Sequence, residues 1–134
     1  MNRTNPHSRC ILVVEDDFFI RDMLVELLEE EGYPVVSAAN GHEALALLRE
    51  TADPPALILL DLMMPVMDGR QFRSAQQDDA ILQAVPVVVL TASSDNEELP
   101  ASFQPAAYVP KPINLQLLLE TVATHFNNHC SSGQ

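Results

Sequence analysis

Short runs of consecutive apolar residues alternate along the chain with longer segments in which apolar residues recur every three or four positions. The run at residues 10–14 is too short for a buried helix and is rich in β-branched side chains, which favours a buried strand. Similar runs predict further strands at residues 34–39, 56–60, 85–90 and 106–109. Strands without polar alternation, separated by helices, indicate a parallel sheet covered on both faces.

The intervening segments carry helix signals. The first has apolar residues mostly three or four positions apart and stops at Gly32, a frequent residue just past a helix end. In the second, Asn40 is the predicted N-cap and Glu43 the acid that returns to it, and the segment Asp53-Pro-Pro55 ends the helix. We expect a third helix near residues 68–78 and a last one over 114–126. The apolar face of the first helix consists of Phe18, Ile20, Met23, Leu24, Leu27 and Leu28.

The length of 134 residues suits one domain. We predict a doubly wound α/β domain with a five-stranded parallel sheet over residues 10–126. The polar ends, residues 1–9 and 127–134, are expected to be flexible. In this class of fold, ligand chemistry lies at the carboxyl ends of the strands.

Polar residues follow the predicted strands at those ends. Glu15, Asp16 and Asp17 follow the first strand, and Asp61 directly follows the third. Thr91 follows the fourth strand, and Lys111 comes soon after the fifth. Because a parallel sheet brings these ends to one edge, we expect the carboxylates to converge there. Clustered carboxylates need a counter-charge, and Mg²⁺ prefers such oxygen ligands.

A magnesium ion, a lysine and a hydroxyl together form a site for a phosphoryl group. The sequence has no Gly-rich phosphate loop, so we do not expect a bound nucleotide. The phosphoryl group is then expected on the protein itself, with Asp61 as the candidate nucleophile. Asp17 is better explained as a helix N-cap than as a ligand.

The net charge of −12 argues against non-specific binding of nucleic acid, which needs clustered basic residues. No apolar run is long enough to cross a bilayer, and the first ten residues contain no secretory signal. Cys10 and Cys130 lie near opposite ends without a Cys-x-x-Cys spacing. Reduced thiols, a cytoplasmic location and no membrane partner are therefore expected.

Four segments at the strand ends together resemble the receiver domains of two-component response regulators, the family of the bacterial chemotaxis regulator. They are ILVVEDD at 11–17, LDLMMPVMDG at 60–69, VLTA at 89–92 and YVPKP at 108–112. The resemblance covers residues 11–126 and implies a flavodoxin-like fold with strand order 2-1-3-4-5. It also implies a signalling switch, not an enzyme with a separate substrate.

The resemblance further implies a role for each matching residue. Asp61 would accept a phosphoryl group from a sensor histidine kinase or phosphotransfer protein. The ligands of Mg²⁺, with Mn²⁺ as the alternative ion, would be Asp16, Asp61, Glu15 through water, and the backbone carbonyl of Met63. The phosphoryl oxygens would contact Lys111 and Thr91, and Thr91 and Tyr108 would move inward as the switch. The Lys111–Pro112 bond would be cis.

Residues 93–106 depart from the family pattern, because Pro100 and Pro105 interrupt the usual fourth helix. We expect that helix to be shortened or displaced, which leaves a homodimer and the downstream target open. The eight residues after the last predicted helix are too few for a helix-turn-helix, so DNA binding is not expected. Two alternative functions are a pseudo-receiver that binds a partner without phosphorylation and a phosphatase like the haloacid dehalogenases. The second would need an acid at Met63.

Overall fold

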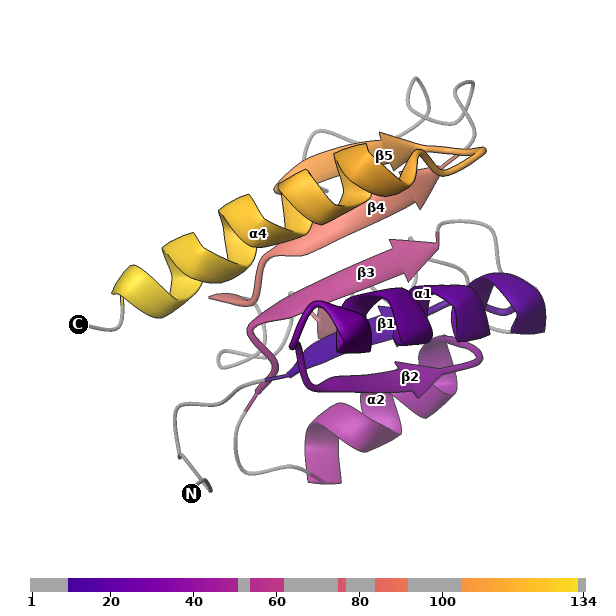
Figure 1. Cartoon of the computed structure of the whole chain (residues 1–134). Helices are drawn as coiled ribbons and strands as arrows, with labels where there is room; N and C mark the ends of the chain where they lie inside the picture. Colours follow the sequence, from indigo (N-terminus) through magenta and orange to yellow (C-terminus); the bar gives the residue numbers. More distant parts are fainter. Residues whose placement is uncertain (1–9, 51–53, 62–74, 77–83, 92–104, 133–134) are drawn as a thin grey trace.

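The protein is built around a parallel five-stranded sheet with strand order β2-β1-β3-β4-β5 (Figure 1). A computed structural model describes residues 10–50, 54–61, 75–76, 84–91 and 105–132. The strands are β1 (Ile11–Val14), β2 (Val35–Ala38), β3 (Leu57–Asp61), β4 (Val87–Thr91) and β5 (Ala107–Pro110). The predicted fold class and strand order are thus confirmed, with strand boundaries within two residues of those expected.

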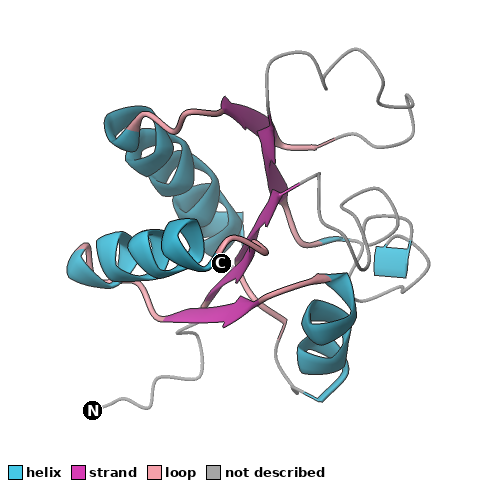
Figure 2. Ribbon diagram, turned by 90° about the vertical axis from the view of Figure 1, so that its right-hand side faces the viewer, coloured by secondary structure: helices cyan, strands magenta, loops and turns pink. Residues whose placement is uncertain are grey.

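Helices cover both faces of the sheet. Helices α1 (Phe18–Glu30) and α4 (Leu115–Ser132) lie on one face, and α2 (Gly41–Glu50) lies on the other (Figure 2). Because successive strand residues point to opposite faces, β1 contributes Leu12 and Val14 to the core beneath α2. Its other two residues, Ile11 and Val13, pack in the core beneath α1 and α4. Burial on both faces explains why the central strands have uninterrupted apolar sequences.

Helix α1 has a defined start and a defined end. At its start, one carboxylate oxygen of Asp17 accepts hydrogen bonds from the backbone N–H groups of Phe19 and Ile20, at 2.9 and 3.2 Å. At its end, Gly32 adopts a φ of 98°, which favours glycine, and the Gly32 and Tyr33 N–H groups donate to carbonyls of the last turn. The predicted cap and the predicted helix end are both confirmed.

The start of α2 differs slightly from the predicted capping box. The Asn40 side chain accepts a hydrogen bond from the Glu43 N–H at 2.9 Å, as an N-cap does. The Glu43 carboxylate, however, accepts from the N–H of Ala39 at 2.8 Å and not from that of Asn40. The Glu43 carboxylate therefore bonds to a residue one position earlier than predicted, directly after the end of β2.

The predicted apolar face of α1 is partly wrong. Phe18 is 60% exposed and Met23 is also exposed, whereas Leu24 and Leu28 are fully buried. Phe18 is the first residue of the helix, and its ring contacts Phe19 and Arg21. Met23 is the residue before Leu24, and adjacent positions on a helix point about 100° apart.

Helix α4 continues to Ser132, six residues beyond the predicted end at Phe126. The structure therefore places residues 127–132 in the helix, and their expected flexibility stays a prediction. No proline or glycine interrupts the sequence between Phe126 and Gly133, so nothing local ends the helix earlier.

Other predictions fall outside the described residues. These are the flexible start at residues 1–9 and residues 93–104 of the segment with the altered helix. Most of the helix predicted near 68–78 is also not described, although residues 75–76 are helical. In the part of the chain that is described, no helix has both the length and the apolar character needed to span a membrane.

Candidate functional site

The strand register brings the predicted site residues to one edge of the sheet. Val14 pairs with Leu60, so Glu15 and Asp61 follow at neighbouring positions where β1 and β3 end. Thr91 ends β4, and its carbonyl accepts a hydrogen bond from the Lys111 N–H at 2.8 Å, just beyond β5. Four strands therefore place one site residue each at their carboxyl ends, as predicted for a parallel sheet.

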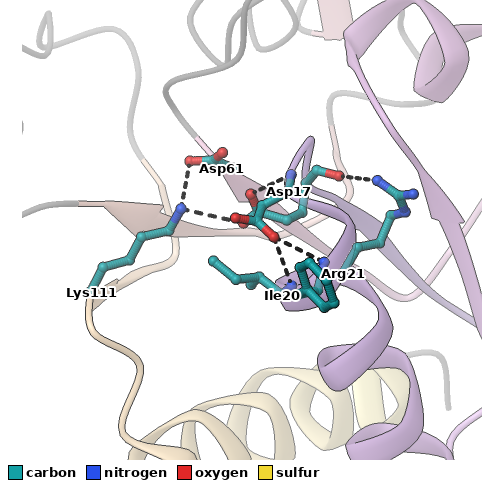
Figure 3. Close-up of polar contacts among 7 residues, drawn as sticks. Asp17, Ile20, Arg21, Asp61 and Lys111 are labelled. Carbon is teal, nitrogen blue, oxygen red and sulfur yellow. Dashed lines mark hydrogen bonds and ion pairs between the residues drawn. The ribbon is translucent and has the colours of Figure 1, made fainter.

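A single ammonium group links two buried carboxylates in this site. Lys111 Nζ lies 3.2 Å from Asp61 Oδ1 and 3.3 Å from Glu15 Oε1 (Figure 3). Lys111 is the only lysine in the sequence. Buried carboxylates are unfavourable without compensation, so this ion pair stabilises both acids in the folded chain.

The backbone and side chain of Glu15 are both constrained. Its N–H extends the β1–β2 ladder by donating to the Ala38 carbonyl at 3.1 Å. Its Oε2 accepts a hydrogen bond from the Asp17 N–H at 3.2 Å. Oε1 is buried and faces Lys111, but it has no hydrogen-bond partner among the described residues. Oε1 of Glu15 therefore faces the site and can still accept a hydrogen bond or bind a cation.

The electrostatics of Asp61 follow from this crowding. Burial, the nearby charge of Glu15 and hydrogen bonds with Glu15 and Asp16 raise the pKa of Asp61 to about 7, although Lys111 opposes the shift. Burial alone would lower the pKa of Lys111, but the two carboxylates outweigh burial and raise it. Without a further cation, the site therefore holds more negative charge than one lysine can balance.

The donor set fits a hard divalent cation. Glu15, Asp16 and Asp61 each offer a carboxylate oxygen, and the three oxygens lie within 4.8 Å of one another. Asp16 is exposed, which leaves an open side for water ligands. All-oxygen ligation with retained waters suits Mg²⁺ and also Mn²⁺. Oε1 of Glu15 faces Lys111 but accepts no hydrogen bond from a described residue, so it is the buried polar atom that such an ion or one of its waters would satisfy.

The remaining predicted residues have different placements. Thr91 is buried at the site edge, whereas Tyr108 lies on β5 with an exposed side chain. Met63 lies outside the described residues, so its predicted role as a carbonyl ligand stays a prediction. The Lys111–Pro112 peptide bond is cis, as predicted.

Arg21 was not among the residues predicted to form the site. Its guanidinium donates a hydrogen bond from Nη1 to the Glu15 carbonyl at 2.9 Å (Figure 3). A local signal was present, because a basic residue near the start of a helix is unfavourable for the helix dipole and needs a specific partner.

Comparison with known proteins gives one consistent family. Residues 11–123 match the family model for the response regulator receiver domain. The chain is 41% identical over 115 residues to the response regulator MprA of Mycolicibacterium vanbaalenii, covering 81% of this chain but only 46% of MprA. It is 31% identical over 122 residues to the polar-differentiation response regulator DivK of Brucella anthropi, covering 90% of this chain and 98% of DivK.

Solved structures give the same result for the fold. The chemotaxis response regulator CheY4 of Vibrio cholerae superposes with a TM-score of 0.79 at 30% identity, covering 87% of this chain and 98% of CheY4. A response regulator structure from Chloroflexus aurantiacus superposes with a TM-score of 0.80 at 27% identity, covering 89% and 98% of the two chains.

Proposed function

The chain belongs to the family of response regulator receiver domains, which are signalling modules, and we propose that it is a phosphoacceptor switch with Asp61 as the acceptor. The observation that carries the proposal is the contact of Lys111 with both Asp61 and Glu15 at the carboxyl edge of the sheet. This arrangement holds the Asp61 carboxylate, as nucleophile, beside the ammonium group of Lys111. Transfer of a phosphoryl group to the protein needs such a nucleophile and a nearby positive charge.

The proposed reaction takes a phosphoryl group from a phosphohistidine on a histidine kinase or a phosphotransfer protein. A carboxylate oxygen of Asp61 forms a bond to phosphorus as the phosphorus–nitrogen bond breaks, and the electron pair of that bond returns to the imidazole. Lys111 neutralises charge on the phosphoryl oxygens, and its present contact with Asp61 Oδ1 already places it beside the acceptor. The chain then carries a mixed phosphoric–carboxylic anhydride at Asp61.

Glu15, Asp16 and Asp61 would hold the divalent cation, with Met63 as a further proposed ligand through its carbonyl. When bound, Mg²⁺ supplies positive charge that favours the ionised carboxylates and offsets the charge of the phosphoryl oxygens. The acceptor must be ionised to attack, and a pKa of about 7 means that Asp61 is only partly ionised at neutral pH when no metal is bound. The proposed reaction therefore depends on both the cation and pH.

The proposed response involves Thr91 and Tyr108. Thr91 is buried where β4 ends, and its hydroxyl can donate to a phosphoryl oxygen. The exposed side chain of Tyr108 lies on the neighbouring strand, so an inward movement of both would link phosphorylation of Asp61 to the surface of β5. A cytoplasmic location is part of the proposal and agrees with Cys10 being a free cysteine.

The test is the intact mass of the protein after incubation with acetyl phosphate and Mg²⁺. We expect the wild type to gain one phosphoryl group and Asp61→Asn to gain none. Asp22→Asn, which changes an exposed acid on α1, is the matched control and should behave as wild type. The gain should disappear when EDTA removes the metal.

A second phosphodonor is needed if acetyl phosphate does not phosphorylate the wild type. The same proteins are incubated with a phosphorylated histidine kinase that accepts many receivers. If the wild type gains no phosphoryl group from either donor, the acceptor function is wrong and the pseudo-receiver alternative replaces it. A gain in Asp61→Asn equal to that of the wild type would instead place the acceptor elsewhere.

A further inference from the structure

Arg21 reaches back from the second turn of α1 to the acidic end of β1. Its Nη1 donates to the carbonyl oxygen of Glu15, six positions earlier in the chain, at 2.9 Å (Figure 3). Side chains of an α-helix lean toward its N-terminus, which allows this backward contact. Arg21 thus connects the helix to the residue that faces Asp61 and Lys111.

The aromatic ring of Phe18 supports the guanidinium. The Arg21 Cζ lies 5.6 Å from the centre of the Phe18 ring, within the range of a cation–π interaction. Phe18 in turn has an edge contact with Phe19, with ring centres 5.6 Å apart. The exposed ring of Phe18, which the apolar pattern of α1 placed in the core, therefore has a polar partner.

The position of Arg21 is unfavourable for a cation by the helix dipole alone. The N-terminus of a helix carries partial positive charge, which favours acids and disfavours bases in its first turns. The Arg21 N–H makes the first α-helical hydrogen bond, to the Asp17 carbonyl at 2.8 Å, so the residue lies close to that end. The contacts with Glu15 and Phe18 are what offset this repulsion.

Glu15 is the residue that this contact restrains. The β1–β2 ladder holds its N–H, Asp17 holds its Oε2, and Lys111 faces its Oε1. The carbonyl is the remaining polar group of Glu15, and Arg21 binds it. Loss of this bond would remove one restraint on the peptide between Glu15 and Asp16, and both residues offer oxygens to the proposed cation site.

We propose that Arg21 is a positioning residue, which fixes the peptide after Glu15 so that Glu15 and Asp16 together bind the divalent cation. The inference rests on the proposed function, because it assumes a cation at these carboxylates. It goes beyond that function by assigning a role to a residue that contacts neither the cation nor the phosphoryl group. Groups that orient metal ligands in this indirect way commonly change metal affinity by tenfold or more when removed.

The alternative is a purely structural role, in which Arg21 satisfies one carbonyl and stabilises the start of α1. Both roles predict a lower melting temperature when Arg21 is replaced. Only the positioning role predicts weaker binding of Mg²⁺ by the variant while it is still folded. Mg²⁺ affinity measured on folded protein therefore separates the two.

The experiment is a titration of the ¹⁵N-labelled full chain with Mg²⁺, followed by the backbone amide shifts of residues 15–17. Arg21→Met keeps the apolar stem of the side chain and removes its donors. We expect its dissociation constant for Mg²⁺ to rise roughly tenfold. Arg21→Lys retains one charged donor and should lie between Arg21→Met and the wild type. Arg49→Met, which replaces an exposed arginine on α2, is the matched control and should bind as the wild type does.

Phe18→Leu provides a second variant in case Arg21→Met does not fold. It removes the ring beneath the guanidinium from an exposed position, and we expect a rise of roughly twofold in the dissociation constant. In mass measurements with acetyl phosphate, Arg21→Met should need more Mg²⁺ to reach half its maximal rate. Its rate at saturating Mg²⁺ should equal that of the wild type.

Each result has a distinct consequence. If Arg21→Met and Phe18→Leu fold and bind Mg²⁺ as the wild type does, the positioning role is wrong and the proposed function is unaffected. If the wild type itself does not bind Mg²⁺, the proposed function fails, and this inference fails with it. A higher dissociation constant with an unchanged rate at saturation supports the inference.

Discussion

Lys111 Nζ lies 3.2 Å from Asp61 Oδ1, although 50 positions separate the two residues in the chain. The same nitrogen also faces Glu15, so a single ammonium group neutralises parts of two buried acids. The ends of β1, β3 and β5 thus bring two carboxylates to one ammonium group, and the negative charge at this edge exceeds the positive charge.

The reactivity of Lys111 should depend on Asp61. The carboxylates raise the pKa of Lys111, so at pH 8 its amine is protonated and reacts slowly with amine-modifying reagents. Asp61→Asn removes one carboxylate and lowers this pKa, and each unit of decrease raises the fraction of free amine about tenfold. Because the sequence has no other lysine, the mass of the labelled peptide measures the rate directly, with the N-terminal amine as internal reference. Equal rates in the two proteins would contradict the ion pair.

The stability of the metal-free protein should fall as pH rises from about 4 to 7. The pKa of Asp61 is about 7 in the folded chain, whereas its ordinary value is 3.8, so the folded state binds the extra proton in this range. Below this range Asp61 is protonated in both states, and above it the unfavourable ionisation of the folded state is fully present.

Asp61→Asn should therefore raise the melting temperature in EDTA more at pH 8 than at pH 5. Each pKa unit corresponds to about 1.4 kcal/mol, or roughly 5 °C in melting temperature, so we expect a gain of at least that size at pH 8. Thermal unfolding monitored by circular dichroism measures this, with Asp22→Asn as the control. A gain that is the same at both pH values would show that charge at Asp61 is not its cause.

Mg²⁺ should stabilise the folded protein through the three carboxylates. A ligand present at 100 times its dissociation constant adds about 2.7 kcal/mol to the free energy of unfolding. We expect a rise in melting temperature with Mg²⁺ at pH 8 that EDTA reverses and that is much smaller in Glu15→Gln. An equal rise in Glu15→Gln would indicate that the ion binds elsewhere.

Asp17 should act as a helix cap and not as a metal ligand. Its carboxylate accepts hydrogen bonds from the N–H groups of Phe19 and Ile20, and loss of such a cap costs about 1 kcal/mol. We expect Asp17→Ala to lower the melting temperature by roughly 4 °C while the Mg²⁺ dissociation constant stays unchanged. Asp22→Ala, at an exposed interior position of α1, should have a much smaller effect. Weaker Mg²⁺ binding by folded Asp17→Ala would assign it a ligand role.

Much of the fold was accessible from local patterns. The apolar runs of β1, β3 and β4 predict buried strands because both faces of each strand are covered. Asp17, Asn40 and Gly32 mark helix ends because caps use hydrogen bonds and dihedral angles within a few residues. The site edge followed from these elements, since parallel strands bring their carboxyl ends together.

The tertiary structure decided which side chains meet at that edge and which remain exposed. Periodicity places Phe18 on the apolar face of α1, but in the folded chain the ring is exposed and lies beside Arg21. The contact of Arg21 with the Glu15 carbonyl depends on the angle at which the chain leaves β1. The sequence alone determined the elements, their caps and the set of acids, because short-range sterics and hydrogen bonds act within a few residues. Distances such as that from Lys111 to Asp61 were decided only by folding, because they depend on packing between segments far apart in the chain.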